Sequence, residues 1–589
     1  MAAHDEDVVG KAYDAVLMRR LMGYLRPYWA HALTALVAIV VHSVLQLAQP
    51  YLMKVAIDNY IAAGDLAGMD RIALLFLAIL VASFALEYVQ TLLLQMIGQR
   101  IMFDLRREIY GHLQRLDVAF YDRNPVGRLM TRVTTDVDAL NDLFTAGVVS
   151  IFGDVFTLVG IMAVLLTMDW RLALVAFSVL PLIVVVTQWF RRNVRESYRT
   201  VRGWIAKINA FLQENITGMA TVQLFRREAR NFGLFEAINR GHRDANIASI
   251  FYFAVFYPAI EIVGALATAL IIWWGGAWVL GGTLTLGSLV AFIQYSQRFF
   301  RPISDMSEKF NLLQSAMAAS ERIFTLLDTP VAITSPAVPA ARPTHGLVEF
   351  DHVWFAYSGE DYVLRDVSFT VQPGQRVGIV GATGAGKSTI INLLMRYYDV
   401  SRGRVLVDGV DIRELDVAAL RQLCSLVLQD VHLFSGTIGG NVRLGQPGIA
   451  DDRVREAIRA VHADRFVDAL PLGIETPVAE RGSTLSTGQK QLLSFARALA
   501  FDPRILVLDE ATSSVDTDTE LLIRDALHVL MEGRTTIAIA HRLSTIQDMD
   551  AILVLHKGHL RESGTHQELL AQRGIYHRLY QLQYKDQER

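Results

Sequence analysis

The chain has 589 residues, which is more than a single hydrophobic core usually organises. Its net charge of −3 at pH 7 points to no particular class of partner, and its one cysteine, Cys424, excludes an internal disulfide or a cysteine cluster. The composition changes along the chain: long apolar runs fill the first half, while the second half has the pattern of an ordinary water-soluble domain. Two parts that face different solvents are therefore predicted, with Cys424 in the core of the second.

The apolar runs of the first half are long enough to cross a membrane. Residues 27–53, 172–190 and 262–297 contain no Lys, Arg, Asp or Glu. A bilayer core of about 30 Å needs roughly 20 helical residues. A buried core helix would explain one such run, but it does not account for the set. We predict six membrane-spanning helices, near residues 29–53, 70–97, 142–168, 171–190, 249–280 and 284–306.

The distribution of positive charge sets the orientation of these spans, because Lys and Arg are retained on the cytoplasmic side. The three short links between spans hold only Lys54, Arg71 and Arg171, whereas the two long links are rich in arginine. Both termini and both long links are therefore predicted to be cytoplasmic. Residues 1–10 are polar and acidic, so we expect no cleaved signal peptide.

Each long link contains a predicted break in its helices. Residues 120–128 include Asn-Pro and Gly, and residues 214–221 include Gly218. Further on, four prolines lie between Asp328 and Pro343, which indicates an extended linker. We therefore predict a membrane domain over residues 1–325, a linker over 326–345 and a soluble domain over 346–589.

The soluble half contains a complete phosphate-binding loop. Residues 381–389 read Gly-Ala-Thr-Gly-Ala-Gly-Lys-Ser-Thr and follow a strand-like run at 376–380. The glycines and the start of the next helix offer backbone amides to anionic oxygens, Lys387 reaches the β- and γ-phosphates, and Ser388 can ligate Mg²⁺. The pattern predicts binding of ATP or GTP, through Gly381, Thr383, Gly384, Ala385, Gly386, Lys387, Ser388 and Thr389.

A second strand-like run, at 504–510, ends in two carboxylates. At the end of a buried parallel strand, Asp509 can hold the hydration shell of Mg²⁺, and Glu510 can polarise the attacking water in phosphoryl transfer. His541 follows another predicted strand, at 536–540, and can donate to the γ-phosphate. Glu510 and His541 are therefore candidate catalytic residues.

A further motif makes a resemblance specific. The run Leu-Ser-Thr-Gly-Gln at 485–489 opens a predicted helix and resembles the signature motif of ABC transporter nucleotide-binding domains. In that family's order, Tyr357 resembles the adenine-stacking aromatic, Gln429 the glutamine that contacts Mg²⁺ and water, and Asp516 the D-loop aspartate. His541 is similar to the switch histidine. The resemblance implies ATP and Mg²⁺ as cofactors, Gln429 among the catalytic residues, and Ser388, Gln429 and Asp509 at the metal.

The membrane half resembles the six-helix exporter type, in which the two cytoplasmic turns are coupling helices. The similarity covers nearly the whole chain and is of the bacterial multidrug or lipid half-transporter kind. It implies a multi-pass protein of the bacterial inner membrane with a cytoplasmic ATPase domain. Because one chain has six spans and one ATPase domain, a dimer is needed to sandwich ATP and enclose a path. ATP would close the ATPase domains and turn the cavity outward, and hydrolysis would reset it.

Two positions depart from the family pattern. Thr487 stands where glycine is usual in the signature, and Ala479 replaces a glycine that is common in the exporter X-loop. In this family the signature contacts the ATP of the partner subunit, so Thr487 would act at the partner's site. An altered signature beside an intact Glu510 resembles the competent half of heterodimeric exporters, and a heterodimer is favoured over a homodimer. The predicted contacts with the partner's ATP are Ser486, Thr487, Gly488 and Gln489.

The substrate is not defined by the sequence. Glu87, Asp154 and Glu261 lie inside apolar spans, where carboxylates usually face a cavity or a partner. They could attract cationic amphiphiles, or they could pair with polar groups or lie near the interface. We expect an amphipathic drug or lipid as substrate, membrane lipid as a contact, and no nucleic acid. The alternative is a membrane protein in which ATP gates a pore or regulates a partner, although Glu510 and His541 favour turnover.

Overall fold

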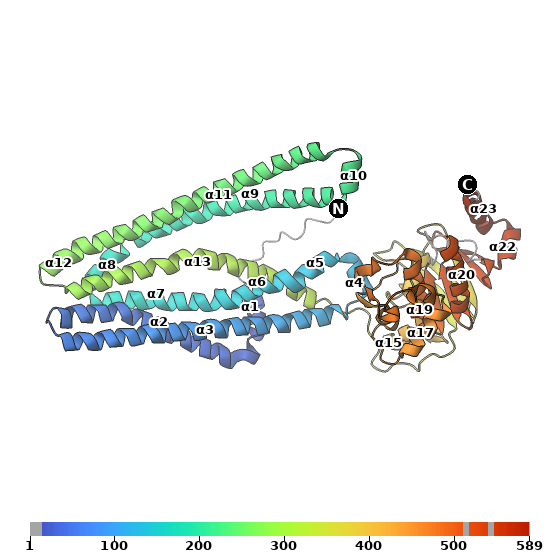
Figure 1. Ribbon diagram of the computed structural model, residues 1–589, viewed down its shortest axis with the longest axis horizontal. Helices are drawn as coiled ribbons and strands as arrows, with labels where there is room; N and C mark the ends of the chain where they lie inside the picture. Colours follow the sequence, from blue (N-terminus) through green and yellow to red (C-terminus); the bar gives the residue numbers. More distant parts are fainter. Residues whose placement is uncertain (1–13, 510–516, 540–546, 588–589) are drawn as a thin grey trace. The chain divides into compact units, whose positions relative to one another are not determined.

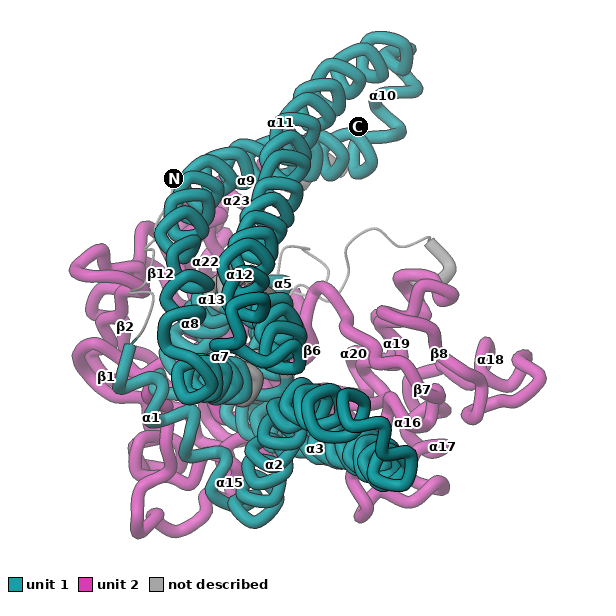
Figure 2. Tube along the Cα trace, turned by 90° about the vertical axis from the view of Figure 1, so that its left-hand side faces the viewer, with its two compact units in different colours: residues 1–114, 126–329 teal, residues 115–125, 330–589 magenta. Residues whose placement is uncertain are grey.

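The computed structural model describes residues 14–509, 517–539 and 547–587. The chain divides into two compact units (Figure 2). The first contains Met1–Gln114 and Val126–Thr329, and the second contains Arg115–Pro125 and Pro330–Arg589. The division after Thr329 falls inside the segment predicted as a linker. The short segment Arg115–Pro125, from the first predicted cytoplasmic turn, belongs with the second unit.

Long helices make up the first unit (Figure 1). They are α2 (Trp29–Val55), α3 (Leu66–Leu113), α7 (Val148–Met168), α9 (Leu180–Thr217), α11 (Glu228–Leu270) and α13 (Leu286–Leu327). The shorter helices are α1 (Ala15–Gly23), α5 (Val126–Thr131), α6 (Val137–Asp142), α8 (Trp170–Phe177), α10 (Met219–Leu224) and α12 (Gly276–Leu280), with a 3₁₀ turn at Arg26–Tyr28. Turns of π-helix occur at Ala56–Ile61, Arg132–Asp136, Leu143–Gly147 and Ile271–Gly275. Each of the six predicted spans lies on these helices.

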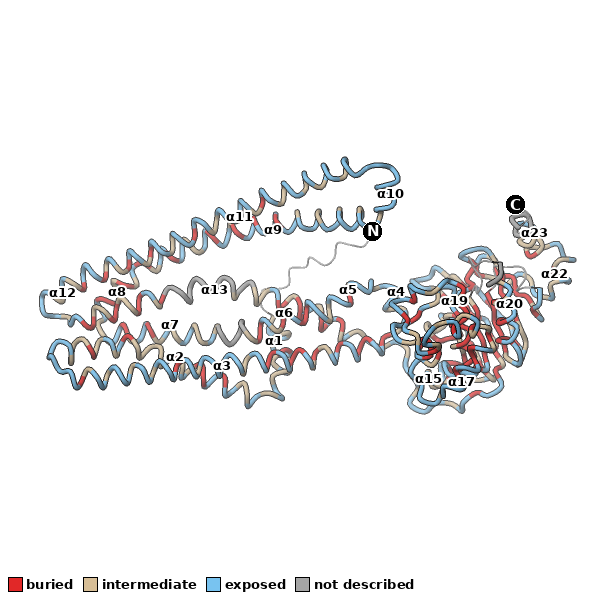
Figure 3. Tube along the Cα trace, viewed as in Figure 1, coloured by how far each residue is buried: buried red, intermediate tan, exposed pale blue. Residues whose placement is uncertain are grey.

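Five segments of the described residues are long and apolar enough to cross a membrane. They are Arg26–Ile61, Leu66–Leu113, Ile151–Met168, Trp170–Thr217 and Glu228–Leu280. In the most apolar window of Leu66–Leu113, only 6% of the residues are buried within the chain. Figure 3 shows the same pattern along α3, whose surface is largely exposed. A helix in the core of a soluble protein would be covered there, so this apolar surface is that of a lipid-facing helix.

The sixth predicted span lies on α13, which is more polar and is not among those five segments. Gln294, Gln297 and Arg298 interrupt its apolar sequence. Its buried Phe292 and Tyr295 belong to an apolar core that also draws on α7 and α8. Helix α13 is therefore packed inside the helical unit and carries polar side chains into it.

The fourth predicted span is broken in two. Helix α8 ends at Phe177 and α9 begins at Leu180, where Pro181 occupies the first turn. Proline has no N–H and its ring clashes with the carbonyl of the preceding turn, so it kinks or breaks a helix in its interior and is well tolerated in a first turn. The sequence-predicted span at 171–190 thus consists of α8 and the start of α9.

Several helices are longer than a membrane requires. Helix α3 has 48 residues, which is roughly 72 Å at 1.5 Å per residue, against a bilayer core of about 30 Å. The predicted turns lie where such helices end: Asn124 caps α4 (Val118–Arg123), and Gly218 ends α9 before α10. Short helices therefore occupy both predicted cytoplasmic turns.

The second unit is an α/β domain built around a six-stranded sheet with the order β12-β11-β3-β10-β9-β6. All neighbouring pairs in it are parallel except β11 and β12. Its strands are β3 (Arg376–Gly381), β6 (Cys424–Val427), β9 (Ile505–Asp509), β10 (Thr535–Ile539), β11 (Ala551–His556) and β12 (His559–Gly564). A four-stranded sheet, β2-β1-β4-β5, and a β7-β8 pair complete the strands. Those strands are β1 (Val348–Phe355), β2 (Leu364–Val371), β4 (Arg402–Val407), β5 (Val410–Asp411), β7 (Gly436–Thr437) and β8 (Pro477–Val478).

Helices cover both faces of the six-stranded sheet. Alternate residues of β9 enter different cores: Leu506 and Leu508 pack with α17 and α19, and Ile505 and Val507 pack with α14. Burial on both faces explains why the strands read as continuous apolar runs. The helices are α14 (Lys387–Leu394), α15 (Val417–Leu423), α16 (Ile438–Arg443), α17 (Asp451–Ala460), α18 (Asp464–Val467), α19 (Thr487–Ala500), α20 (Thr517–Met531), α22 (His566–Gln572) and α23 (Ile575–Gln587), with 3₁₀ turns at Gly473–Glu475 and Glu480–Gly482.

The prediction of a helical membrane domain followed by an α/β domain is confirmed. Cys424, at the start of β6, is buried as predicted, with 8% of its surface exposed. Burial raises the pKa of its thiol to about 12.

The segment predicted as an extended linker is tied to the second unit. The Asp408 carboxylate accepts hydrogen bonds from the backbone amides of Thr344, His345 and Leu347 at 2.7–2.8 Å. Burial opposes the charged form of Asp408, but these amides outweigh it and hold the pKa of Asp408 below its usual value. Ser335 donates to the Asp416 carboxylate at 2.7 Å. The proline-rich chain is therefore extended but not free.

Candidate functional site

Four neighbouring strands of the parallel sheet lead to the predicted nucleotide residues. In the order β3-β10-β9-β6, Ile539 pairs in register with Ile379 and with Asp509, and Leu508 pairs with Val427. The phosphate loop starts at the end of β3, Asp509 ends β9, and Gln429 follows β6 closely. Because the carboxyl ends of parallel strands meet at one edge of a sheet, these groups are brought together at that edge.

The phosphate loop has a backbone that requires glycine. Gly384 and Gly386 have φ of +80° and +102°, values that residues with a side chain rarely adopt. A Cβ atom at Gly386 would also lie 2.6 Å from Cδ2 of Leu364. Gly386 is the N-cap of α14, and no side chain among the described residues caps that helix. The amides of the loop and of the first turn are therefore available to an anion.

Lys387 is buried, with only 7% of its surface exposed. Its Nζ donates to the carbonyl oxygens of Gly381 and Ala382 at 2.8 and 3.2 Å, so the ammonium group spans the loop that it follows. A phosphate oxygen in the loop would offer this cation a charged acceptor, which makes a stronger hydrogen bond than a neutral carbonyl. The position of Lys387 is the one that the sequence motif predicts.

Tyr357 follows β1 and is held against the helix of the phosphate loop. Its hydroxyl lies 3.1 Å from Oγ1 of Thr389 and accepts from Nδ2 of Asn392 at 3.2 Å. The rings of Phe355 and Tyr398 meet it edge-on, with centroids 4.8 and 5.1 Å away. Tyr357 nevertheless remains 46% exposed. A fixed, half-exposed ring beside the phosphate loop is suited to stacking on a base.

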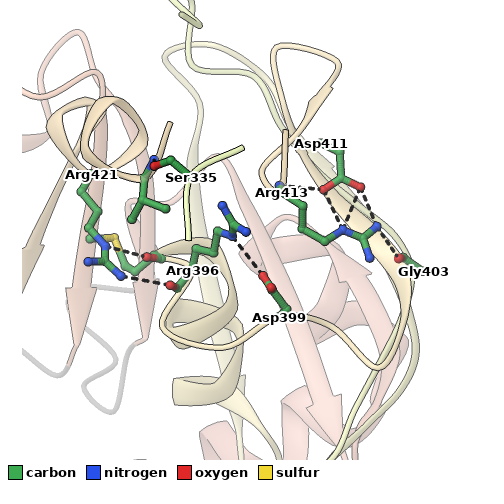
Figure 4. A network of polar contacts seen from close by, with 9 residues as sticks. Ser335, Arg396, Asp399, Gly403, Asp411, Arg413 and Arg421 are labelled. Atoms are coloured by element: carbon green, nitrogen blue, oxygen red, sulfur yellow. Dashed lines mark hydrogen bonds and ion pairs between the residues drawn. The ribbon is translucent and has the colours of Figure 1, made fainter. Parts of the chain in front are cut away.

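The opposite end of α14 is fixed by a network that the sequence did not reveal (Figure 4). Arg421 donates to the carbonyl oxygens of Met395 and Arg396 at 3.3 and 3.0 Å, and Arg396 donates to Asp399 at 3.1 Å. Carbonyls after the last helical turn lack intrahelical donors, and the negative end of the helix dipole favours a cation. Arg421 thereby fixes the helix whose other end carries the phosphate loop.

The signature residues lie at the start of α19. Ser486 is the N-cap and forms a capping box with Gln489: the Gln489 amide donates to Oγ of Ser486 at 3.2 Å, and the Ser486 amide donates to Oε1 of Gln489 at 2.9 Å. Thr487 and Gly488 are the first helical residues. The positive end of this 14-residue helix suits an anion, as the predicted contact with a phosphate requires.

Three predicted site residues, Glu510, Asp516 and His541, lie outside the described residues. The strands that lead to two of them are those predicted, since β9 ends at Asp509 and β10 at Ile539.

The oxygen donors of this site are suited to a Mg²⁺ ion that binds together with a nucleotide. No group of three or more His, Cys, Asp or Glu side chains within the described ranges could hold a metal by itself. Mg²⁺ usually keeps several waters and is bound by one or two protein groups together with phosphate oxygens. Ser388, Gln429 and Asp509 supply oxygen atoms at the edge where the phosphates would lie.

Comparison with known proteins identifies the chain. The family model described as "ABC transporter transmembrane region" matches residues 32–303, and the model described as "ABC transporter" matches residues 364–513. A Bacillus subtilis (strain 168) protein, "Probable multidrug resistance ABC transporter ATP-binding/permease protein YheH", is 39% identical over 526 residues, which are 88% of this chain and 77% of the relative. The chain belongs to the ABC transporter family.

Two further similarities place this ABC transporter among exporters. A "Fatty acid ABC transporter ATP-binding/permease protein" of Mycobacterium bovis (strain ATCC BAA-935 / AF2122/97) is 40% identical over 517 residues, covering 87% of this chain and 82% of the relative. The solved structure of a bacterial Atm1-family ABC exporter with ATP bound has a TM-score of 0.78 at 29% identity, and the match covers 97% of this chain and 99% of that one. This ABC transporter is a multi-pass membrane protein of the bacterial exporter type, with an ATPase domain coupled to transport.

One contact of the ABC transporter was missed by the sequence analysis. Within the second unit, the hydroxyl of Tyr398 donates a hydrogen bond to the carboxylate of Asp122 in α4. Burial, together with the hydrogen bond to Asp122, raises the pKa of Tyr398, so its hydroxyl stays protonated at neutral pH. The two residues are 276 positions apart, and no local pattern connects them.

The three membrane carboxylates of the ABC transporter have different surroundings. Asp154 on α7 forms an ion pair with Lys309 on α13, and the two side chains are 23% and 15% exposed. Glu87 on α3 and Glu261 on α11 are exposed in the single chain, and the ion pairs of the described residues do not include them. Of the two possibilities for a membrane carboxylate, attracting a cationic substrate or pairing with a polar group, Asp154 shows the second.

Proposed function

We propose that this ABC transporter exports amphipathic drugs or lipids by alternating access, driven by ATP binding and hydrolysis in a dimeric nucleotide sandwich. The observation that carries the proposal is the alignment of the phosphate loop, Asp509 and Gln429 at one edge of the parallel sheet. That edge belongs to a chain whose other unit is built from lipid-facing helices. The site turns over nucleotide, and the membrane helices provide the path.

The residues of the site have distinct roles in this function. The phosphate loop and Lys387 bind the phosphates, and Tyr357 stacks on the base. Mg²⁺, held by Ser388, Gln429 and Asp509, supplies charge neutralisation on the phosphates when it is bound. Glu510 orients and polarises the attacking water, with Gln429 beside it, and His541 donates to the γ-phosphate. Asp516 has the role of the D-loop aspartate, as the resemblance implies.

An amphipathic substrate agrees with the surfaces of the helical unit. An apolar groove of about 250 Å³ between α2 and α7 is lined by Leu36, Ile39 and Val40 on one side and by Phe152 and Phe156 on the other. Such a lining accepts hydrocarbon and offers nothing to a strongly polar solute. The relatives described above as a fatty acid transporter and a probable multidrug resistance transporter support the same class of substrate.

The partner in the sandwich is a second half-transporter, and a different one. Thr487 is the second residue of the capped turn that opens α19, where the family usually has glycine. Because this turn acts on the partner's nucleotide, its alteration leaves the chain's own site intact and modifies the site across the interface. A heterodimer in which this chain supplies the competent carboxylate, Glu510, accounts for both features.

Transport by the purified complex tests the function. In inside-out proteoliposomes, the wild-type complex should accumulate a fluorescent amphiphile when ATP and Mg²⁺ are added, and the Glu510→Gln complex should bind ATP without accumulating the dye. Accumulation requires coupling between turnover and movement of the substrate. An ATP-dependent ion conductance without uphill accumulation of any amphiphile would instead support the alternative, in which ATP gates or regulates the membrane domain.

A further inference from the structure

Pro50 removes one backbone hydrogen bond from the last part of α2. In a regular α-helix the amide of residue 50 donates to the carbonyl of Gln46, and proline has no amide hydrogen. Inside a membrane such a carbonyl needs another donor, because the hydrocarbon offers none. In the structure Arg298 on α13 supplies it: Nη1 of Arg298 donates to the Gln46 carbonyl at 2.7 Å.

Two more contacts from α13 surround this break in α2. Nη2 of Arg298 donates to Oε1 of Gln49 at 2.8 Å, and the hydroxyl of Tyr295 donates to the carbonyl of Leu47. Tyr295 is fully buried, and Arg298 is half-buried. The guanidinium group is thus anchored on α2, and the residue is not fully buried.

Arg298 lies deep in the membrane. At 1.5 Å per residue it is roughly 18 Å along α13 from the start of that helix at Leu286, and its acceptor Gln46 is roughly 14 Å from the end of α2 at Val55. Both positions therefore lie inside predicted spans, Arg298 in the one at 284–306 and Gln46 in the one at 29–53. A charge at this depth is costly unless a cavity, a partner or a ligand compensates it.

The surroundings of Arg298 in the described part of the chain offer it no carboxylate. No ion pair there includes it, whereas Lys309 on the same helix is neutralised by Asp154. Nε2 of His42 lies 2.8 Å from Nε2 of Gln46, and Nδ1 of His42 lies 3.1 Å from the carbonyl oxygen of Ser83, so this ring contacts α2 and α3 and offers Arg298 no carboxylate. The positions three and four residues from Arg298 on α13 also lack carboxylates: they are Gln294, Tyr295, Arg301 and Pro302.

We infer that Arg298, together with Gln49, binds the anionic headgroup of an amphipathic substrate, a carboxylate or a phosphate. The inference rests on the proposed function and names its substrate class. A guanidinium is a planar fork of donors that matches these headgroups, and two of its nitrogens are used by α2. Bonds to a charged acceptor are strengthened in the low dielectric of the membrane. This site would prefer an anionic substrate, whereas the carboxylates Glu87 and Glu261 suggest a cationic one from the sequence.

Pro50 also makes it possible to remove the charge of Arg298 without disturbing the backbone of α2. Arg298→Gln alone would leave the Gln46 carbonyl without its donor and could disturb α2. Pro50→Ala returns an amide to position 50, and that amide can pair with the Gln46 carbonyl within the helix. The double variant Pro50→Ala/Arg298→Gln therefore removes the charge while α2 keeps its backbone hydrogen bonds. Pro50→Ala is the matched control, and Arg171→Gln, at the end of a short link, controls for loss of one positive charge.

Binding is measured on the nucleotide-free complex in phosphatidylcholine nanodiscs, with radiolabelled palmitate and hexadecyltrimethylammonium as probes of equal chain length. Palmitate should bind to the wild type, to Pro50→Ala and to Arg171→Gln with similar affinity, and at least tenfold more weakly to Pro50→Ala/Arg298→Gln. The cationic probe should not lose affinity in the double variant. Acetate at equal concentration should not compete, because the site takes the headgroup of an amphiphile and not a free anion.

Three results would overturn the inference. They are unchanged palmitate affinity in the double variant, an equal loss for both probes, and competition by acetate as strong as by palmitate itself. Because neither nucleotide nor transport enters this measurement, its failure leaves the proposed export function standing. Conversely, a complex that binds palmitate through Arg298 but accumulates no amphiphile would refute export and retain the site.

Discussion

The hydroxyl of Tyr398 donates a hydrogen bond to the carboxylate of Asp122, while its ring lies edge-on against Tyr357 with centroids 5.1 Å apart. Tyr357 is in turn bonded to Thr389 and Asn392 on the helix of the phosphate loop. Contiguous contacts therefore lead from α4, at the first cytoplasmic turn, to the ring proposed to stack on the base. A nucleotide that moves Tyr357 would therefore also move Tyr398 and its hydrogen-bond acceptor, Asp122.

Tyr398→Phe should weaken the coupling of ATP hydrolysis to substrate. The substitution keeps the ring against Tyr357 and removes only the hydroxyl, and a hydrogen bond to a charged acceptor contributes about 1.5–3 kcal/mol. We expect basal ATPase activity within twofold of the wild type and a clear loss of substrate-stimulated activity. Tyr397→Phe, whose ring lies 5.2 Å from the guanidinium of Arg421, is the matched control. Full substrate stimulation in the Tyr398→Phe complex would remove this contact from coupling.

Glu510→Gln should bind ATP normally and hydrolyse it at least tenfold more slowly. A tenfold loss corresponds to about 1.4 kcal/mol of transition-state stabilisation, a modest demand on a residue that polarises the attacking water. Asp509, the residue before Glu510 in the sequence, ends β9 at the edge of the sheet that carries the phosphate loop. Steady-state phosphate release and nucleotide binding on the same purified complex measure the two quantities. Turnover near the wild-type rate would exclude Glu510 from the chemical step.

Lys387→Ala should abolish closure on ATP. The buried ammonium spans the loop and is the cation that would meet the β- and γ-phosphates. We expect at least tenfold weaker ATP binding and no ATP-dependent change in the accessibility of a thiol probe in the membrane cavity. Lys207→Ala, an exposed lysine in the first unit, controls for the loss of one positive charge. The role assigned to Lys387 fails if affinity and accessibility both stay at wild-type values.

Local motifs predicted the elements around the nucleotide site, because each motif is a short contiguous run at the end of a buried strand or the start of a helix. The phosphate loop, the strand before Glu510 and the helix after the signature were all predicted from runs of a few residues. The sequence did not predict the contacts that join distant segments. Arg421 caps α14 from 25 residues away, Arg298 reaches Gln46 across 252 residues, and Tyr398 reaches Asp122 across 276. Pro50 and Pro181 can be read from the sequence as places where a helix is disturbed. Only the packed helices show how the structure accommodates them.

Cys424 should not react with N-ethylmaleimide in the native complex, even at pH 9. The thiolate is the reactive form, and burial raises the pKa of Cys424 to about 12, so at pH 9 the thiol stays protonated where an exposed cysteine would be largely ionised. Intact-mass measurement before and after denaturation detects the modification. Glu360→Cys, at an exposed position, provides a reactive control. Modification of Cys424 as fast as the control would contradict its burial; protection would allow thiol probes to be used without removing it.

Purification of this chain from its native source should bring down a second, different half-transporter of similar length. Thr487 lies in the capped turn that we propose acts on the partner's nucleotide, and an altered signature is expected opposite a site that has lost its own carboxylate. Native mass spectrometry should therefore show two different chains in equal number, and the partner's sequence should lack an acidic residue at the position equivalent to Glu510. In that complex, Glu510→Gln in this chain alone should remove nearly all ATP turnover, because the other site contributes little. If this chain by itself forms a dimer with substrate-stimulated hydrolysis at both sites, the heterodimer is refuted and Thr487 is compatible with a fully active signature.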